Sequence, residues 1–214
     1  MHKKIILFCS IFLLIGCSRI DETTDYISLV NNCLTQKKIT NNVAIGYKYY
    51  IPKGVTKMHD YNYNHVFLID NTKLYLYVDI ISYFYKKEEN FEKNNDAIYY
   101  EEIKNNDKKG YIEILKENEN YYIKIEYNYS KIESYVKENN INRIITLSSI
   151  ILNSIDYNDR VIEKVLDGDF GEFSEITYKV NKPNDASNNF SQYLEEYAQK
   201  EKKENKEKKQ LPDE

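Results

Sequence analysis

The sequence is poor in several residue types that shape protein architecture. It has no Trp, three Pro, six Gly and three Cys among 214 residues. No Pro occurs from residue 53 to residue 182, and no Gly- or Ser-rich stretch there marks a linker between domains. The part of the chain from about residue 40 to residue 182 has the size of one ordinary domain. We therefore predict a single folded domain.

The N-terminal apolar run is too short for a membrane-spanning helix. It extends from Ile5 to Ile15, about 11 residues, whereas a transmembrane helix needs roughly 20. Lys3 and Lys4 precede the run and small residues follow it, which is the organisation of an export signal. We predict that residues 1–16 are a signal peptide, in preference to a buried strand or a membrane helix.

The end of this run is specific. The residues Leu14-Ile15-Gly16-Cys17 resemble the lipobox of bacterial lipoproteins, and the resemblance covers the first 17 residues. It implies that the Cys17 thiol receives a diacylglyceryl group and that Cys17 becomes the mature N-terminus. One acyl chain anchors a protein marginally and two or more anchor it stably. We therefore expect lipid anchoring at the extracytoplasmic face of the cell membrane.

Cysteine chemistry is limited to one thiol in the predicted mature protein. Cys9 leaves with the signal peptide and Cys17 carries the lipid, so Cys33 has no intramolecular disulfide partner. Cys33 lies on the apolar stripe of a helix predicted over residues 24–37. We predict a buried core residue there, and the alternative is a redox or nucleophilic thiol.

The chain also lacks a basic surplus. It has 30 Lys and Arg residues against 34 Asp and Glu residues, and removal of Lys3 and Lys4 with the signal leaves a net charge of about −6. An acidic chain without a basic stripe is a poor ligand for nucleic acid, and charge alone would not hold it on anionic lipid. We predict no nucleic-acid partner and membrane attachment through Cys17.

Tyr is abundant, with 22 residues. Many of these tyrosines alternate along predicted strands, where packing explains them, and the codon usage of an AT-rich genome favours Tyr as well. The other interpretation is a Tyr-lined surface that binds glycan or peptide.

Hydrophobic periodicity predicts an α+β fold with a mainly antiparallel sheet packed by helices. Helical spacing indicates helices over 24–37 and 140–155, with Asn140 as the N-cap. Alternation predicts strands over residues 43–51, 65–69, 73–85, 110–116, 121–130 and 173–180. Asp79 is expected in mid-strand with its side chain in solvent. The stretch 55–64 is predicted to be a polar loop and 86–109 a partly helical connection.

The domain organisation follows from these elements. A tether over residues 17–22 precedes the α+β domain, which is expected to span 23–182. Residues 183–214 begin with Pro183 and become dense in Lys and Glu. Because an isolated helix of that length is marginal in water, we predict a C-terminal helix followed by a charged, disordered tail.

The sequence GYKYYIPKGV, which begins at Gly46, is similar to the early strand of PsbP-like domains, where Gly-aromatic-x-aromatic-x-x-Pro precedes a short loop. The order of a hairpin, a long insertion, a second hairpin and the helix at 140–155 is similar as well. The resemblance spans residues 23–180 and implies a sheet sandwiched between helices. Members of that family are mostly extracytoplasmic binding or assembly factors without catalytic groups.

Catalytic motifs are missing: the sequence has no Gly-rich phosphate loop, no G-x-S-x-G and no H-E-x-x-H. His59, Asp60 and His65 are candidates for a metal site, but a structural zinc site needs four ligands and these three crowd one loop without Cys. We predict a solvated loop there and no metal centre. The acidic stretch LDGDFGEF is predicted to be a turn, because Tyr178 stands where a calcium loop needs Glu.

These observations favour a membrane-anchored, non-catalytic lipoprotein that binds a protein or envelope partner, without a cofactor and without catalytic residues. Two alternatives stay open. A small extracytoplasmic hydrolase would need a concave site with convergent carboxylates or the two histidines. A ligand-capturing lipoprotein that feeds a transporter usually has two lobes, for which this chain is short.

Overall fold

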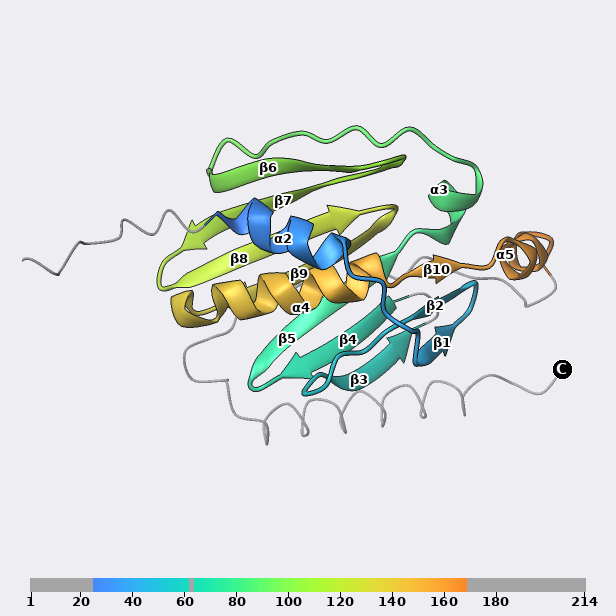
Figure 1. Ribbon diagram of the computed structural model, residues 1–214, viewed down its shortest axis with the longest axis horizontal. Helices are drawn as coiled ribbons and strands as arrows, with labels where there is room; N and C mark the ends of the chain where they lie inside the picture. The colour runs from blue at the N-terminus through green and yellow to red at the C-terminus, as the bar shows by residue number, and fades with distance from the viewer. Residues whose placement is uncertain (1–24, 62–63, 169–214) are drawn as a thin grey trace, which may run out of the picture.

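A computed structural model describes residues 25–61 and 64–168, which form an α+β fold with a mainly antiparallel sheet, as predicted (Figure 1). The large sheet has seven strands in the order β3-β4-β5-β9-β8-β7-β6. Its strands are β3 (Thr56–Tyr61), β4 (Asn64–Ile69), β5 (Thr72–Val78), β6 (Ala97–Asn105), β7 (Lys108–Glu117), β8 (Asn120–Tyr127) and β9 (Ser130–Val136). All its neighbouring strands pair antiparallel.

The strand order requires one long crossing. β3, β4 and β5 follow one another as hairpins, and the chain then passes through α3 (Ile80–Phe84) and residues 85–96 to the opposite edge of the sheet. From β6 it returns strand by strand until β9 pairs with β5. Residues 85–96, which we call the connector, therefore carry the chain from β5, inside the sheet, to β6 at its edge.

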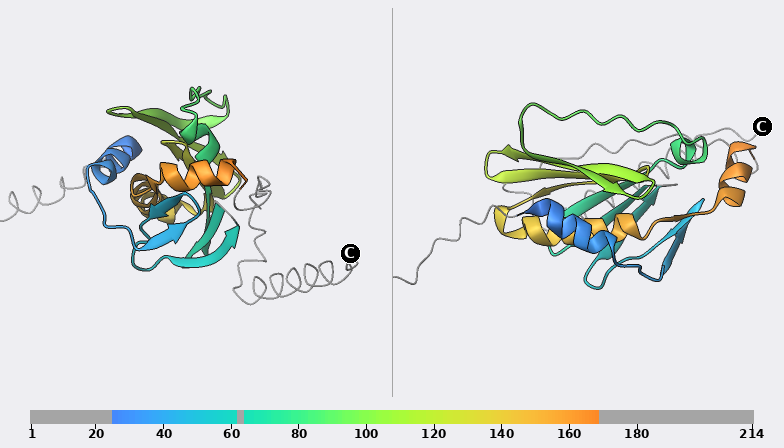
Figure 2. Two further views of the ribbon diagram at one scale, coloured as in Figure 1. Left: turned by 90° about the vertical axis from the view of Figure 1, so that its right-hand side faces the viewer. Right: turned by 45° about the horizontal axis from the view of Figure 1, so that its top comes forward.

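Two helices cover one face of the large sheet, which we call the inner face. α4 (Ile141–Asn153) packs against β8 and β9, and α2 (Tyr26–Leu34) lies beside α4 and touches β6. Both views in Figure 2 show the two helices side by side on the same face. We call the opposite face the outer face.

The inner face is aliphatic because alternate strand residues point to it. The fully buried side chains of this layer include Leu74, Leu76, Ile112, Ile114, Ile123, Ile125 and Ile132. α4 meets them with Ile141, Ile144, Ile145, Ile151 and Leu152, which recur at helical spacing and are buried. Full burial of one such side chain stabilises the fold by about 1.5–3 kcal/mol.

The helix predictions were close to the observed bounds. Asp25 caps α2 by accepting a hydrogen bond from the Ser28 amide. Asn140 stands at the N-cap position of α4, but its side chain makes no capping hydrogen bond, and a 3₁₀ turn, η1 (Glu138–Asn140), leads into the helix. Cys33 is buried, as its place on the apolar stripe predicted.

The strand predicted over 43–51 is wrong, because the chain turns back on itself there. β1 (Asn42–Ala44) and β2 (Tyr47–Tyr49) form a hairpin, and β10 (Asp156–Tyr157) completes a small three-stranded sheet. Gly46 has φ of 85°, a conformation that Gly adopts without a steric cost. A Cβ at Gly46 would also lie 2.9 Å from Ile162, which belongs to α5 (Asp159–Leu166).

Three further predictions need correction. The expected loop at 55–64 contains β3, because its residues pair with β4. Asp79 is not in mid-strand: it ends β5 and caps α3 by accepting a 2.8 Å hydrogen bond from the Ser82 amide. No helix occurs over 86–109; the connector is irregular and β6 follows it.

Two predicted regions lie outside the described residues: the signal peptide with its tether, and everything after residue 168, including the strand expected over 173–180. Among the residues that the structure does describe, no helix is long and apolar enough to cross a bilayer. The sandwich implied by the PsbP-like resemblance needs helices on both faces of the sheet. Within the described part, α2 and α4 cover the inner face, so the sandwich stays a prediction.

Candidate functional site

The outer face of the large sheet carries Tyr, Lys and Glu where the inner face carries aliphatic residues. Alternation on β5, β9, β8, β7 and β6 brings these side chains into cross-strand rows. One row is Tyr77, Lys131, Glu126, Tyr111 and Glu102, and the next is Tyr75, Glu133, Lys124, Glu113 and Tyr100. Directly opposed residues in an antiparallel sheet are close enough to interact, and opposite charges there are stabilising.

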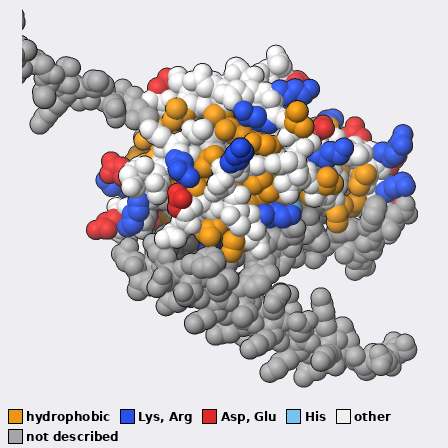
Figure 3. Space-filling view, turned by 60° about the horizontal axis from the view of Figure 1, so that its bottom comes forward, with side chains coloured by type: hydrophobic (Ala, Val, Ile, Leu, Met, Phe, Trp, Pro, Cys, Tyr) orange, Lys and Arg blue, Asp and Glu red, His pale blue; other side chains and the backbone are white. Residues whose placement is uncertain are grey.

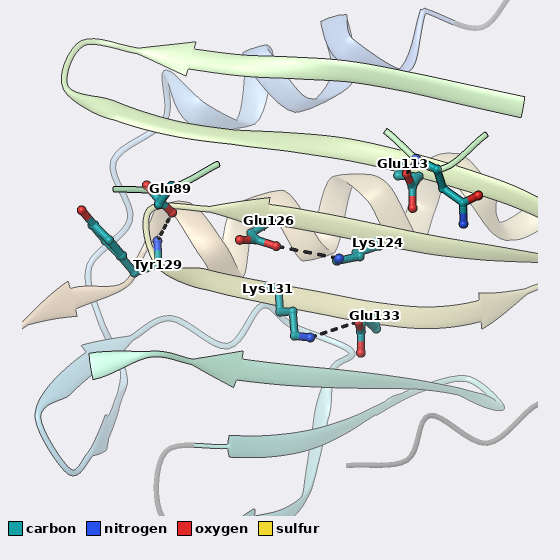
Figure 4. A network of polar contacts seen from close by, with 8 residues as sticks. Glu89, Glu113, Lys124, Glu126, Tyr129, Lys131 and Glu133 are labelled. Atoms are coloured by element: carbon teal, nitrogen blue, oxygen red, sulfur yellow. Dashed lines mark hydrogen bonds and ion pairs between the residues drawn. The ribbon is translucent and has the colours of Figure 1, made fainter. Parts of the chain in front are cut away.

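The charges within the rows neutralise one another only in part (Figure 4). Lys131 Nζ lies 3.2 Å from Glu133 Oε1, but Lys124 Nζ lies 3.9 Å from Glu126 Oε2. The second distance is well beyond the roughly 2.7–2.9 Å of a charge-assisted hydrogen bond. The Glu126 carboxylate is thus only loosely paired with its nearest strand neighbour.

The connector lies against one part of the outer face. The Asn94 amide donates to Glu113 Oε1 at 2.9 Å, and the Phe91 ring packs on Tyr111 with 5.1 Å between ring centroids. Glu113 is only 6% exposed as a result, although it belongs to the polar face. These contacts hold the connector on the sheet, although the connector itself forms neither a helix nor a strand.

Tyr129 fixes the start of the connector. Its amide donates to Glu89 Oε1 at 3.1 Å, and its hydroxyl donates to the Lys87 carbonyl at 3.0 Å. Tyr129 sits with Asn128 in the turn between β8 and β9, and both have positive φ, 61° and 51°. Type I′ hairpin turns need positive φ at both central residues and favour Gly at the second. A bulky Tyr there is strained, which its contacts with the connector and with the Tyr83 ring offset.

A pocket of about 340 Å³ opens between the connector and the sheet. Its volume lies within the range of small-molecule sites, about 300–1,000 Å³. Three aromatic rings and six charged side chains from four parts of the fold surround it. The lining consists of Tyr77, Asp79, Ser82, Lys87, Glu88, Glu89, Asn90, Phe91, Glu126, Tyr129, Ser130 and Lys131.

Burial shapes the electrostatics of the pocket. Loss of water raises the pKa of Glu89 and of Glu126 above the usual range, against the opposing effects of the Tyr129 amide and of Lys124 respectively. Burial and the neighbouring Glu126 and Glu113 carboxylates raise the pKa of Tyr111, so this phenol stays protonated. The pocket therefore presents two carboxylates that lack full solvation.

The metal candidates from the sequence do not share a loop. His65 is on β4, 2% exposed, with its Nε2 atom 2.7 Å from the Tyr47 hydroxyl and its ring stacked on Tyr49. His59 and Asp60 lie on β3, where the backbone of Asp60 is opposite His65. The expected solvated loop is thus wrong. Among the residues whose side chains the structure describes, which leave out His59 and Asp60, no group of three or more His, Cys, Asp or Glu could hold a metal ion.

The remaining candidates from the sequence are Cys33, the acidic stretch that begins at Leu166, and Cys17. Cys33 lies 3.7 Å from the Thr146 carbonyl, and burial raises the pKa of its thiol, which makes it a poor nucleophile. Asp167 is the C-cap of α5 and Gly168 follows with φ of 84°, but the rest of the predicted turn lies outside the described residues. Cys17, the expected lipidation site, lies outside the described residues.

Sequence reasoning missed the pocket because its walls come from separated segments. Glu126 and Lys131 alternate with buried residues, so the sequence does place them on a polar face. Glu89 and Phe91 belong to a charged stretch with no periodicity, and only the fold brings them to the sheet. The one local signal was Asn128-Tyr129, an Asn followed by a bulky residue where a hairpin turn prefers Gly.

No family model matches this chain, and no curated protein matches it. The residues of the site therefore have to be interpreted from their geometry and chemistry.

Proposed function

We propose that this protein is a lipoprotein anchored through Cys17 at the extracytoplasmic face of the cell membrane, and that its α+β domain is a non-catalytic binding module for a protein or envelope partner. The lipobox-like sequence Leu14-Ile15-Gly16-Cys17 supports the location. The similarity to PsbP-like domains supports binding or assembly as the type of function.

The observation that carries the binding role is the outer face of the sheet. Among the described elements, both long helices pack on the inner face, and the outer face presents Tyr, Lys and Glu around a pocket. Aromatic residues are enriched at protein interfaces, and a polar surround keeps such a face soluble before the partner binds. The connector adds an irregular segment to the surface of the sheet.

Mass spectrometry and fractionation test the anchored state. We expect the membrane-bound protein to begin at Cys17 and to carry a diacylglyceryl thioether. A Cys17→Ala variant should stay unprocessed or be released from the membrane, whereas a Cys33→Ala variant, which also loses one thiol, should be processed normally. Native protein that is soluble and retains residues 1–16 would contradict the proposal.

A second function has a specific observation in its favour. Glu89 and Glu126 line one pocket and both have a raised pKa, as a carboxyl group needs in order to act as a general acid near neutral pH. Paired carboxylates are also the catalytic groups of most glycoside hydrolases. A small extracytoplasmic hydrolase is therefore the alternative. Turnover of chromogenic glycosides or esters that disappears in Glu126→Gln would favour it over a binding module.

A further inference from the structure

The pocket beside Tyr129 is more acidic than basic. Asp79, Glu88, Glu89 and Glu126 line it, against Lys87 and Lys131. The Lys131 ammonium forms an ion pair with Glu133 on the same strand, with 3.2 Å between Nζ and Oε1. Lys124 and Lys131 attract Glu126, and the Tyr111 hydroxyl hydrogen-bonds to it, but the loss of water outweighs these effects, so its charge is incompletely compensated.

The carboxylates approach the pocket from opposite walls. Glu126 projects from β8 in the sheet, and Glu89 comes from the connector, where the Tyr129 amide holds one of its oxygens at 3.1 Å. Asp79 comes from the end of β5, with one oxygen bound to the Ser82 amide. Burial penalises the charge of Glu89 and Glu126. A positive group between them would replace the solvation that folding removed.

The walls indicate which kind of cation fits. Tyr77, Phe91 and Tyr129 supply aromatic rings, and rings attract organic cations through their π faces. The ammonium of Lys131 already lies over one of these rings, with Nζ 5.4 Å from the centre of the Tyr77 ring. A bare divalent ion would prefer six to eight oxygen ligands, whereas a pocket of about 340 Å³ with mixed aromatic and carboxylate walls has room for an alkyl chain.

We propose that this pocket binds a primary ammonium group on a short alkyl chain, and that the group is a Lys side chain of the protein partner, a step that rests on the proposed function. The ammonium lies between Glu126 and Glu89, and its alkyl chain runs along the rings of Phe91 and Tyr129. The same chemistry in a free alkyl amine would fill the site equally well, so the experiment separates the two sources.

Two ligands and one matched control peptide provide the test. The ¹⁵N-labelled mature protein in detergent micelles is titrated with 1,5-diaminopentane, and separately with a blocked pentapeptide of four Gly around one Lys. A pentapeptide with norleucine in place of Lys has the same length without the charge. We expect saturable shifts of the Ser82, Glu89, Tyr129 and Ser130 amides with the diamine and with the Lys peptide, and none with the norleucine peptide.

Charge-matched variants locate the binding. Glu126→Gln should weaken the binding of both ligands by about tenfold or more, because it removes a desolvated carboxylate from the pocket. Glu119→Gln makes the same change in the turn at the other end of β8, outside the pocket, and should leave the affinity unchanged. Phe91→Leu keeps an apolar side chain but removes the ring, and should weaken ammonium binding by a smaller factor.

The outcomes are distinct. Diamine binding without peptide binding would overturn the assignment to a partner's Lys side chain and leave a site for free amines. Equal loss in Glu126→Gln and Glu119→Gln, or no shifts with either ligand, would overturn the ammonium site altogether. If the protein binds a partner but no ammonium, the proposed binding function stands without this pocket. Failure of lipid anchoring or of partner binding would instead count against the proposed function itself.

Discussion

The two faces of the large sheet are made by the same strands and have opposite chemistry. On β8, Ile123 and Ile125 point into the layer under α4, whereas Lys124 and Glu126 point outward. The inner face is closed by helices and provides most of the hydrophobic stabilisation. The outer face contributes less to stability and is free to carry chemistry. Substitutions at neighbouring positions of one strand can therefore separate folding from binding.

Adjacent substitutions on β8 should show the largest difference. Ile123→Ala removes a buried side chain beneath α4 and should lower the free energy of unfolding by about 2–5 kcal/mol. Lys124→Ala, one residue away on the outer face, should cost less than about 1 kcal/mol. Guanidinium titration of both variants measures the two values. Similar losses would show that the outer face is also a structural layer.

Substitutions of Tyr129 should have an intermediate effect, because the residue combines strain with stabilising contacts. Tyr129→Ala loses the hydroxyl hydrogen bond to the Lys87 carbonyl and the ring contact with Tyr83, but it keeps a side chain at φ of 61°. Tyr129→Gly loses the same contacts and relieves the strain. We expect the Gly variant to be more stable than the Ala variant by about 1 kcal/mol.

The measurement for Tyr129 combines urea titration with proteolysis of the connector. Both variants should expose residues 85–96 to protease more than the native protein does, since both lose the hydroxyl bond to the Lys87 carbonyl and keep only the backbone amide bond to Glu89. If the Ala variant equals the Gly variant in stability, the positive φ is not strained. If neither variant changes cleavage, Tyr129 does not hold the connector.

The smallest effect concerns pH and Glu126. Burial raises the pKa of this carboxyl group in the folded state, against Lys124 and Lys131 and with Glu133 reinforcing the shift. Folding therefore favours the protonated form of Glu126. The contribution of this group to the free energy of unfolding is present at low pH and is lost as the pH rises through the raised pKa. Glu126→Gln should consequently be more stable than the native protein at pH 7, and the advantage should vanish near pH 4.

Thermal unfolding from pH 4 to pH 8 checks the sign of this effect. Glu119→Gln is the control for the loss of one negative charge, since this side chain is 83% exposed in the turn between β7 and β8, outside the pocket. A Glu126→Gln variant that is less stable at pH 7 would mean that the carboxylate is well compensated in the folded protein. In that case the outer face would have no unsatisfied charge to offer a ligand.

Regular alternation explains which parts of the fold could be predicted. The hairpin of β7 and β8 and the helix α4 have long periodic patterns, and both occur where the sequence indicated. The β1–β2 hairpin was missed because Tyr47 and Tyr49 continue the alternation of Val43 across the turn at Gly46. Alternation alone cannot show a turn when the spacing of apolar residues is unchanged on both sides of it.

The site was less predictable than the fold, for a different reason. His65 looked like a loop residue because of its polar neighbours, but it is buried against Tyr47 and Tyr49, which are 18 and 16 residues earlier in the chain. The pocket depends on the connector lying across the sheet, through contacts such as that of Asn94 with Glu113. No local pattern encodes a contact between an irregular segment and a strand that follows it.

Site-specific photo-crosslinking tests most directly whether the outer face is the binding surface. Benzoyl-phenylalanine replaces Tyr77 on the outer face or Asn142 on the exposed side of α4 in the full-length protein, produced in the cells that lipidate it. The account predicts one defined crosslinked protein with the probe at position 77 and not at 142, lost when Glu126→Gln is added. A defined crosslink at position 142 and none at 77 would contradict it.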